Sequence, residues 1–314
     1  MDAKLPAVFP VTAHVAGSFV PIEVIPLTAA AILYWHRAMV LAWDERSVPL
    51  WRQLCFGSGL ALIAIALFSP IGHISEELVL AHMGEHLLMG DIATLLLVLG
   101  LTRSLLQPIL AIKVFDRLQI LTHPLVALPL WGVNLFVWHV PALYQDAYGT
   151  APIHALEHGS FIFFGALMWM PVVGPLPKPE WFTAAWKVGY VVVVRFAGAI
   201  LGNVLMWSGT VLYPIYAPGE RYWNISAQAD QSTAGALMMV EGTFLILGVL
   251  AWVFLDVARQ GVEKQRLLDL AAERGVELDE RRAQRAVASG HAALLEERLT
   301  GADAAEDERE PDRV

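Results

Sequence analysis

The chain has 314 residues, of which 56% are hydrophobic and only 16% charged, and its mean hydropathy is +0.54. A soluble domain would carry roughly a quarter charged residues, so this composition excludes an ordinary soluble protein. Charged residues concentrate after about residue 257, and the net charge of −9 therefore indicates no nucleic acid or other strongly charged partner. The single cysteine, Cys55, excludes an internal disulfide and a multi-cysteine metal motif.

Seven stretches of the chain are long and apolar enough to cross a membrane. About 20 mainly apolar residues are needed to cross the hydrocarbon core, and backbone polar groups in lipid must pair within the segment, which favours helices. The predicted spans are approximately residues 20–41, 52–70, 78–101, 122–140, 152–173, 183–206 and 232–256. The expected fold class is therefore all-α, a polytopic membrane protein with a seven-transmembrane-helix bundle.

Basic residues alternate between the predicted connections. They occur in the first, third and fifth connections and in the tail, whereas residues 71–77 and 141–151 contain none. The sixth connection has only Arg221 and the N-terminal segment only Lys4. Because cytoplasmic loops carry an excess of Lys and Arg, the N-terminus is predicted outside and the C-terminus in the cytoplasm. We expect a multi-pass protein of a bacterial inner (cytoplasmic) membrane.

The sequence divides into four predicted parts. These are an external N-terminal segment (residues 1–19), the transmembrane domain (20–256), a cytoplasmic amphipathic helical tail (257–300) and an acidic, disordered end (301–314). Apolar residues such as Leu267 and Ala271 recur at helical spacing in the tail, as do Leu295 and Leu299 further on. The tail is either a solvated end without a specific role or a docking element for a partner.

Five histidines from three predicted helices reach a similar depth below the outer surface. His82 and His86 lie in the first turns of the third span, His139 near the outer end of the fourth, and His154 and His158 at the start of the fifth. Residues four apart share one face of a helix, so each of the two pairs presents both imidazoles on one stripe. Ionisable groups inside a membrane are costly, which makes this grouping a candidate metal site.

Imidazole suits zinc, copper, iron and nickel, while thioether sulfur selects reduced copper. We therefore predict a site for copper, with zinc as the alternative, whose ligands are the five histidines. Additional candidate ligands nearby in the predicted topology are His73, Met83, Met89, Met238, Met239, Glu85 and Glu157. The methionines also fit ordinary core packing, and the two glutamates could instead orient the imidazoles as hydrogen-bond acceptors.

Two charged residues fall near the middle of predicted spans. Asp91 lies in the third span and Arg195 in the sixth, at similar depth, and neither would be stable facing lipid. The sequence therefore predicts a buried Asp91–Arg195 ion pair, made directly or through water, with Glu241 as a further neighbour. Such a pair either fixes helix packing or forms part of a polar path below the metal site.

Short motifs follow one another from about the second span to the seventh. They are His82-Met83-Gly84-Glu85-His86 with Leu99-Gly100, then Trp138-His139-Val140-Pro141-Ala142-Leu143-Tyr144, then His154-Ala155-Leu156-Glu157-His158 with Trp169, then Tyr213 and Tyr216, and finally Asp230-Gln231 with Gly235 and Met238. In this order they resemble the CtaG-type cytochrome c oxidase assembly family. The resemblance implies supply of copper to, or assembly of, the copper-containing subunit of the oxidase, and it leaves out the C-terminal tail.

The leading hypothesis is therefore a non-enzymatic one. It is a membrane copper-binding assembly factor, or metallochaperone, that supplies or inserts copper for a haem-copper cytochrome c oxidase and has an oxidase subunit or another assembly protein as its partner in the lipid. The alternative is a seven-helix membrane zinc hydrolase, in which three imidazoles hold zinc and Glu85 serves as general base. A third hypothesis is a metal transporter or haem electron carrier, with copper moving inward past Asp91.

Overall fold

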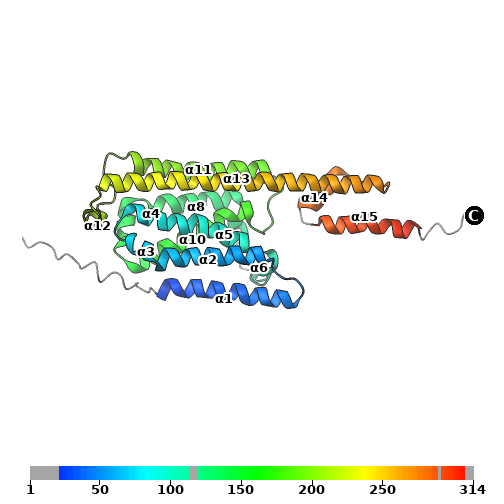
Figure 1. Ribbon diagram of the computed structural model, residues 1–314, viewed down its shortest axis with the longest axis horizontal. Coiled ribbons are helices and arrows are strands. Elements are labelled where there is room, and N and C mark those ends of the chain that lie inside the picture. Colours follow the sequence, from blue (N-terminus) through cyan, green and yellow to red (C-terminus); the bar gives the residue numbers. More distant parts are fainter. Residues whose placement is uncertain (1–20, 114–118, 289–290, 308–314) are drawn as a thin grey trace, which may run out of the picture. The chain divides into compact units, whose positions relative to one another are not determined.

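The computed structural model describes residues 21–113, 119–288 and 291–307, and every regular element within these ranges is a helix (Figure 1). The chain forms two compact units, Met1–Ile246 and Leu247–Val314. The first unit contains most of the apolar helices and all of the candidate ligands. The predicted external segment, residues 1–19, lies outside the described residues.

Six helical segments among the described residues are long and apolar enough to cross a membrane, and a bent pair of helices makes a seventh if it counts as one span. The six are α1 (Pro21–Trp43), α2 (Leu50–Phe68), the succession α4 (Val79–Leu87), η2 (Leu88–Ala93) and α5 (Thr94–Gly100), α10 (Ala151–Val173), α11 (Ala184–Trp207) and α13 (Ala227–Glu273). Large apolar side chains such as Leu33 and Phe196 are exposed on these helices, as lipid-facing surfaces require. The all-helical, multi-pass fold is thus confirmed, while the orientation of the termini stays a prediction.

The fourth span is bent rather than straight. Helix α8 (Pro124–Trp138) ends one residue before His139, and α9 (Pro141–Tyr148) continues at an angle of 75°. The cause is Pro141, because the residue before a proline is forced out of the helical region. Val140 accordingly has an extended backbone (φ −65°, ψ 123°), and Pro141 occupies the first position of the new helix. His139 therefore lies at a break between two helices.

The third span contains a π-helical segment, η2, between two α-helices. Its loosened backbone is held from α10: the Trp169 indole donates a hydrogen bond to the Asp91 carbonyl at 3.0 Å. The Thr94 hydroxyl donates to the Gly90 carbonyl, and Gly165 of α10 packs directly on that same carbonyl. π-helical turns inside α-helices are frequent at functional sites, and this one carries Asp91.

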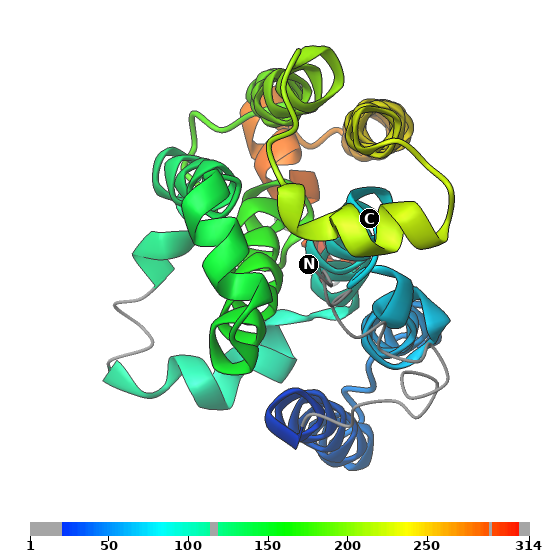
Figure 2. The ribbon, with the colours of Figure 1, turned by 90° about the vertical axis from the view of Figure 1, so that its left-hand side faces the viewer.

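Short helices connect the spans, namely α3 (Pro70–Ile74), α6 (Arg103–Leu110), η3 (Gln119–Thr122), η4 (Pro214–Tyr216) and α12 (Ala217–Tyr222). Figure 2 views the first unit along its helices and shows α12 lying across one end of the bundle. At this end Asp230 of α13 accepts hydrogen bonds from the backbone N–H groups of Val79 (2.7 Å) and Leu80 (2.9 Å). Asp230 thus caps α4, which has no capping side chain of its own.

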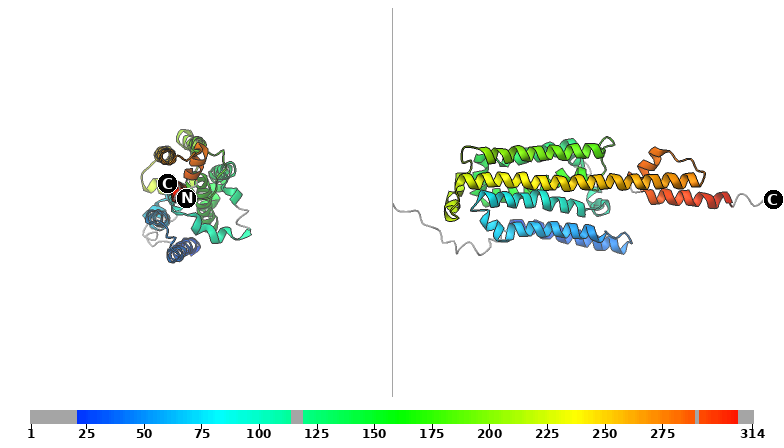
Figure 3. Two further views of the ribbon diagram at one scale, coloured as in Figure 1. Left: turned by 90° about the vertical axis from the view of Figure 1, so that its right-hand side faces the viewer. Right: turned by 45° about the horizontal axis from the view of Figure 1, so that its top comes forward.

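Helices α11 and the first part of α13 run side by side (Figures 1 and 3). Gly202 of α11 and Gly235 of α13 face each other so closely that a methyl group on either would meet the other's carbonyl oxygen. Small residues allow this approach, which is a usual way for membrane helices to associate. Gln231, one turn before Gly235, bonds the Leu212 N–H at 2.7 Å and fixes the loop that precedes α12.

The second unit contains the end of α13 together with α14 (Glu280–Ala288) and α15 (Ala292–Asp307). Its apolar core comprises Leu267 and Ala271 of α13 and Leu295 and Leu299 of α15. A 2.7 Å ion pair joins Lys264 to Glu280. Helix α13 continues through the predicted tail boundary at residue 257 without a break, and α15 includes residues 301–307 of the segment predicted to be disordered.

Candidate metal centre

Two helices supply the central imidazoles, each through a pair four residues apart. The ring centroids of His82 and His86 on α4 lie 4.2 Å apart, and those of His154 and His158 on α10 lie 4.1 Å apart. The pairs face each other across the helix interface, with 5.3 Å between His86 and His158 and 5.8 Å between His82 and His154. The spacing in the sequence and the packing of α4 near α10 thus bring four of the five predicted ligands together.

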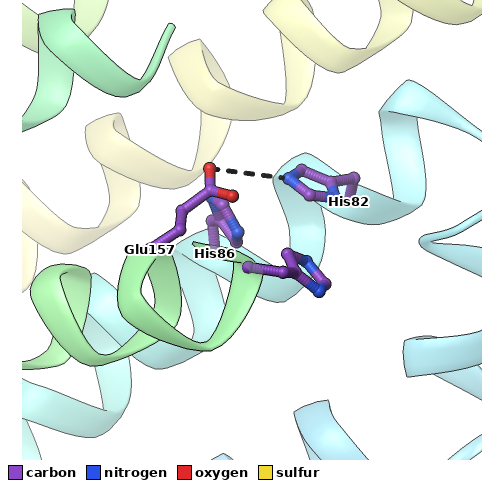
Figure 4. Close-up of side chains that lie close together, drawn as sticks. His82, His86 and Glu157 are labelled. Carbon is purple, nitrogen blue, oxygen red and sulfur yellow. Dashed lines mark ion pairs between the residues drawn. The ribbon is translucent and has the colours of Figure 1, made fainter. Parts of the chain in front are cut away.

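Glu157 completes the centre of this group. Its Oε1 atom lies 4.0 Å from His82 Nε2 and 3.9 Å from His86 Nδ1, and Figure 4 shows the carboxylate of α10 directed toward His82. One ligand atom from each of His82, His86, His154 and Glu157 lies within 4.8 Å of the other three. We call these four residues the His/Glu cluster. The sequence ranked Glu157 only as an additional ligand, whereas the structure places it among the imidazoles.

Several ring nitrogens of the His/Glu cluster have no hydrogen-bond partner. His82 Nε2, His154 Nε2 and both ring nitrogens of His86 are buried without a hydrogen bond. Buried polar groups without partners are costly and rare, so several in one place indicate an ion-binding site. Three imidazoles and one carboxylate form a donor set that fits zinc or copper. His154 is only half-buried and gives the cluster its contact with the surroundings.

His158 is adjacent to the cluster but has a partner of its own. Its Nδ1 atom lies 3.0 Å from Oε1 of Glu23, which reaches it from the first turn of α1. Its Nε2 atom is buried without a hydrogen bond and remains free to bind an ion. Sequence reasoning missed Glu23, although it is the single acidic residue of the first span. A carboxylate on the far nitrogen is the usual way to orient a metal-binding histidine.

His139 is not a member of the His/Glu cluster. Its Nδ1 atom lies 2.7 Å from the Leu135 carbonyl oxygen, and its Nε2 atom lies 3.4 Å from the sulfur of Met83. At the break before Pro141, His139 therefore contacts Met83 of α4 and not the His/Glu cluster. The depth of His139 in the membrane stays a prediction, and the direction of its side chain could not be anticipated from the sequence.

The additional candidate ligands separate into groups. Glu85 is buried beside the cluster, with Oε2 lacking a hydrogen bond, and His73 is half-buried in the last turn of α3. Met89 packs in an apolar cluster with Ile63 and Ala93, and Met239 contacts Gly202 of α11. Met238 instead lines a cavity below the histidines.

This cavity has a volume of about 70 Å³ and extends from His86 and His139 to the charged residues of the mid-span. Asp91, Arg195 and Glu241 all line it, but no ion pair within 4.0 Å joins Asp91 to Arg195. The guanidinium donates instead to the Met239 carbonyl (2.8 Å) and the Thr243 hydroxyl (3.0 Å). Asp91 and Arg195 thus line one mainly apolar cavity without forming an ion pair within 4.0 Å.

Three tyrosines cover the cluster on the side of η4. The Tyr144 and Tyr216 hydroxyls are 2.8 Å apart, Tyr144 stacks on Tyr213 at 4.1 Å, and the His82 ring lies 5.0 Å from that of Tyr144. The Tyr213 hydroxyl donates to the His139 carbonyl at 2.9 Å. Burial raises the pKa of both Tyr213 and Tyr216, so these phenols stay neutral and bring no negative charge to the site.

The geometry defines a multi-pass helical membrane protein with a buried imidazole–carboxylate cluster near one end of its bundle. Residues 32–260 match the model of the cytochrome c oxidase caa3 assembly factor family (Caa3_CtaG). The chain belongs to this family, and the match also covers the second half of α1, beyond the part where the motifs were recognised. Searches of curated proteins and of solved structures found no match.

Proposed function

We propose that this assembly factor binds copper at the His/Glu cluster and supplies it to a haem-copper cytochrome c oxidase. Membership of the family makes the chain an oxidase assembly factor and implies contact with the oxidase or its assembly machinery. The observation that carries the copper proposal is the convergence of four ligand atoms within 4.8 Å, contributed by His82, His86, His154 and Glu157. The partner that receives the metal would be an oxidase subunit or another assembly protein.

The chemistry of the cluster supports an ion that is held and then released. Imidazole nitrogen binds copper well, and Glu157 supplies negative charge that offsets the cation in a buried site. Glu23 on His158 supports the site from a third helix. With His154 half-buried, one ligand lies at the edge of the cluster, where it can exchange the ion with a partner. The expected position at the outer face would let the protein take copper from outside the cell.

The test is the metal content of full-length protein purified from copper-replete membranes. The variant His86→Ala/His154→Ala removes one imidazole from each helix and should lose most of its bound copper. Glu157→Gln should weaken copper binding by at least the roughly 10- to 100-fold that removing a supporting partner costs. His36→Ala, at an exposed position of α1, is the matched control and should bind copper normally. None of these changes alters loop charge or apolar length, so insertion should be unaffected.

Cells that carry the double variant should have low oxidase activity at limiting copper. Added copper should restore part of it, because mass action compensates for a weakened site. Normal copper content together with normal oxidase activity in the double variant would overturn the proposal. Bound zinc with amide or ester cleavage would replace it with the hydrolase hypothesis, since three histidines around zinc with an open position activate water.

A further inference from the structure

Met83 and His139 form a close buried contact outside the His/Glu cluster. The thioether sulfur of Met83 lies 3.4 Å from Nε2 of His139. Both residues are buried, Met83 with 1% of its surface exposed and His139 with 8%. Met83 comes from α4 and His139 from the break between α8 and α9, so the contact joins two separate spans.

The other ring nitrogen of His139 fixes the chemistry of this contact. Nδ1 lies 2.7 Å from the Leu135 carbonyl oxygen, which can only accept a hydrogen bond. Nδ1 therefore carries the hydrogen, and in the neutral imidazole Nε2 presents a lone pair. That lone pair faces a thioether sulfur, which has no hydrogen to donate. Two electron-pair donors face each other in a buried place, an arrangement that a cation between them would stabilise.

We propose that Met83 and His139 bind a second metal ion, reduced copper, at a site distinct from the His/Glu cluster. Thioether sulfur selects Cu(I) among the biological metals, whereas the nitrogen and oxygen donors of the cluster suit zinc and Cu(II) as well. Metal–nitrogen bonds are about 2.0 Å and metal–sulfur bonds about 2.3 Å, so one ion can contact both atoms across a 3.4 Å gap. A histidine that donates its far N–H to a backbone carbonyl is oriented as metal ligands usually are.

The surroundings favour a soft ion in this position. Met83 and His139 line the 70 Å³ cavity together with Met168 and Met238, so two further thioether side chains border the same cavity. The Phe161 ring lies near both sites, with its centroid 4.6 Å from that of His86 and 6.3 Å from that of His139. The inference deepens the proposed copper function, since it gives the same cargo a second, sulfur-containing site.

The deciding experiment compares Met83→Leu with Met89→Leu in full-length protein. Leucine keeps the volume of methionine while removing its sulfur. Met89 is fully buried in the neighbouring η2 segment, but it packs against apolar residues away from the cavity and is therefore the matched control. Anaerobic titration with Cu(I) against a chromophoric chelator should show at least a tenfold loss of affinity for one ion in Met83→Leu. X-ray absorption should show copper–sulfur scattering in the wild type and in Met89→Leu, and its loss in Met83→Leu.

Copper–sulfur scattering that persists unchanged in Met83→Leu, or that is missing from the wild type, would overturn the second site. In selenomethionine-labelled wild-type protein, copper at this site would contact selenium, so the absence of copper–selenium scattering would also overturn the second site without a core substitution. The His/Glu cluster is tested separately, by comparing the Zn(II) or Cu(II) affinity of His86→Ala/His154→Ala with that of the wild type. A wild type that lacks copper–sulfur contact but binds Zn(II) or Cu(II) at the cluster refutes only the second site. A wild type that shows copper–sulfur contact, but whose Zn(II) or Cu(II) binding is unchanged in His86→Ala/His154→Ala, refutes only the proposed function.

Discussion

Arg195 brings a positive charge into the middle of α11, where water is scarce. Its guanidinium bonds the Met239 carbonyl and Thr243, while its other terminal nitrogen is buried without a hydrogen bond. Glu241, two residues from both of these partners on α13, has a buried oxygen that also lacks a hydrogen bond and lies within electrostatic reach of Arg195. Like Asp91, Glu241 forms no ion pair with Arg195 within 4.0 Å, and we expect Glu241 to be the carboxylate that compensates Arg195.

A double-mutant cycle distinguishes the two partners. Arg195→Gln and Glu241→Gln should each destabilise the protein, because each leaves a partly buried charge uncompensated. Together they should cost less than their sum, with a coupling energy of about 0.5–3 kcal/mol. The measurement is the free energy of unfolding in detergent. Asp91→Asn serves as the comparison and should couple more weakly to Arg195→Gln; stronger coupling there would reinstate the pairing inferred from sequence.

At the residue scale, the sequence predicted which histidines share a depth but not which share a direction. The pairs His82–His86 and His154–His158 came together because spacing of four residues fixes one helix face. His139 instead contacts Met83, because the direction of its side chain depends on the bend at Pro141. Glu23 was missed because its contact with His158 joins helices far apart in the chain, and no local pattern encodes that pairing.

The interface between α10 and the π-helical segment η2 positions the two halves of the His/Glu cluster. Gly165 packs on the Gly90 carbonyl, and Trp169 binds the Asp91 carbonyl on the same side of α10. Phe161 also contacts Gly90 one turn earlier. The histidines of α10 lie directly above these contacts in the same helix. The distance between the helices at Gly165 therefore sets how closely Glu157 can approach His82 and His86.

Gly165→Ala should separate these helices. The added methyl group would collide with the Gly90 carbonyl oxygen, and backbone cannot move aside without shifting a helix. Overpacking of this kind costs about 1–3 kcal/mol, and we also expect weaker metal binding at the His/Glu cluster. Thermal unfolding in detergent and metal affinity measure the two effects.

Gly159→Ala is the control for this change, because Gly159 lies on the same helix with no atom of a neighbour within 4 Å of the new methyl group. It should be neutral or stabilise α10 by up to about 1 kcal/mol through helix propensity. Equal loss of stability in both variants would show that the close approach at Gly90 does not position the site.

At the element scale, apolar length predicted the membrane helices because a span must satisfy its backbone within about 20 residues. The π-helical turn at Asp91 could not be predicted from the sequence, since it is held by Trp169 and Gly165 of another helix. The capping of α4 by Asp230 could not be predicted from the sequence either, because the two residues that Asp230 bonds are about 150 residues away in the chain. The bend at Pro141 could have been predicted, because the residue before a proline is disfavoured in helical conformation.

Across the whole molecule, the His/Glu cluster lies near the ends of spans whose connections lack basic residues. The connection that contains α3 and the one that contains α9 have neither Lys nor Arg, and the connection with α12 has only Arg221. The opposite connections carry Arg46 and Arg103, among others. Since basic loops stay in the cytoplasm, the cluster should open toward the outside, and the direction of copper supply depends on this orientation.

Cysteine accessibility tests the orientation directly, because Cys55 is the only native cysteine. In a Cys55→Ser background, Asp146→Cys marks the connection with α9 and Asp44→Cys marks the first connection; both positions are exposed. A membrane-impermeant maleimide added to intact cells should label Asp146→Cys at once and Asp44→Cys only after the membrane is opened. The expectation follows from the free energy of moving basic loops across a membrane, and neither substitution touches a basic residue. Labelling in the reverse order would place the His/Glu cluster at the cytoplasmic face, and copper would then have to reach it from inside the cell.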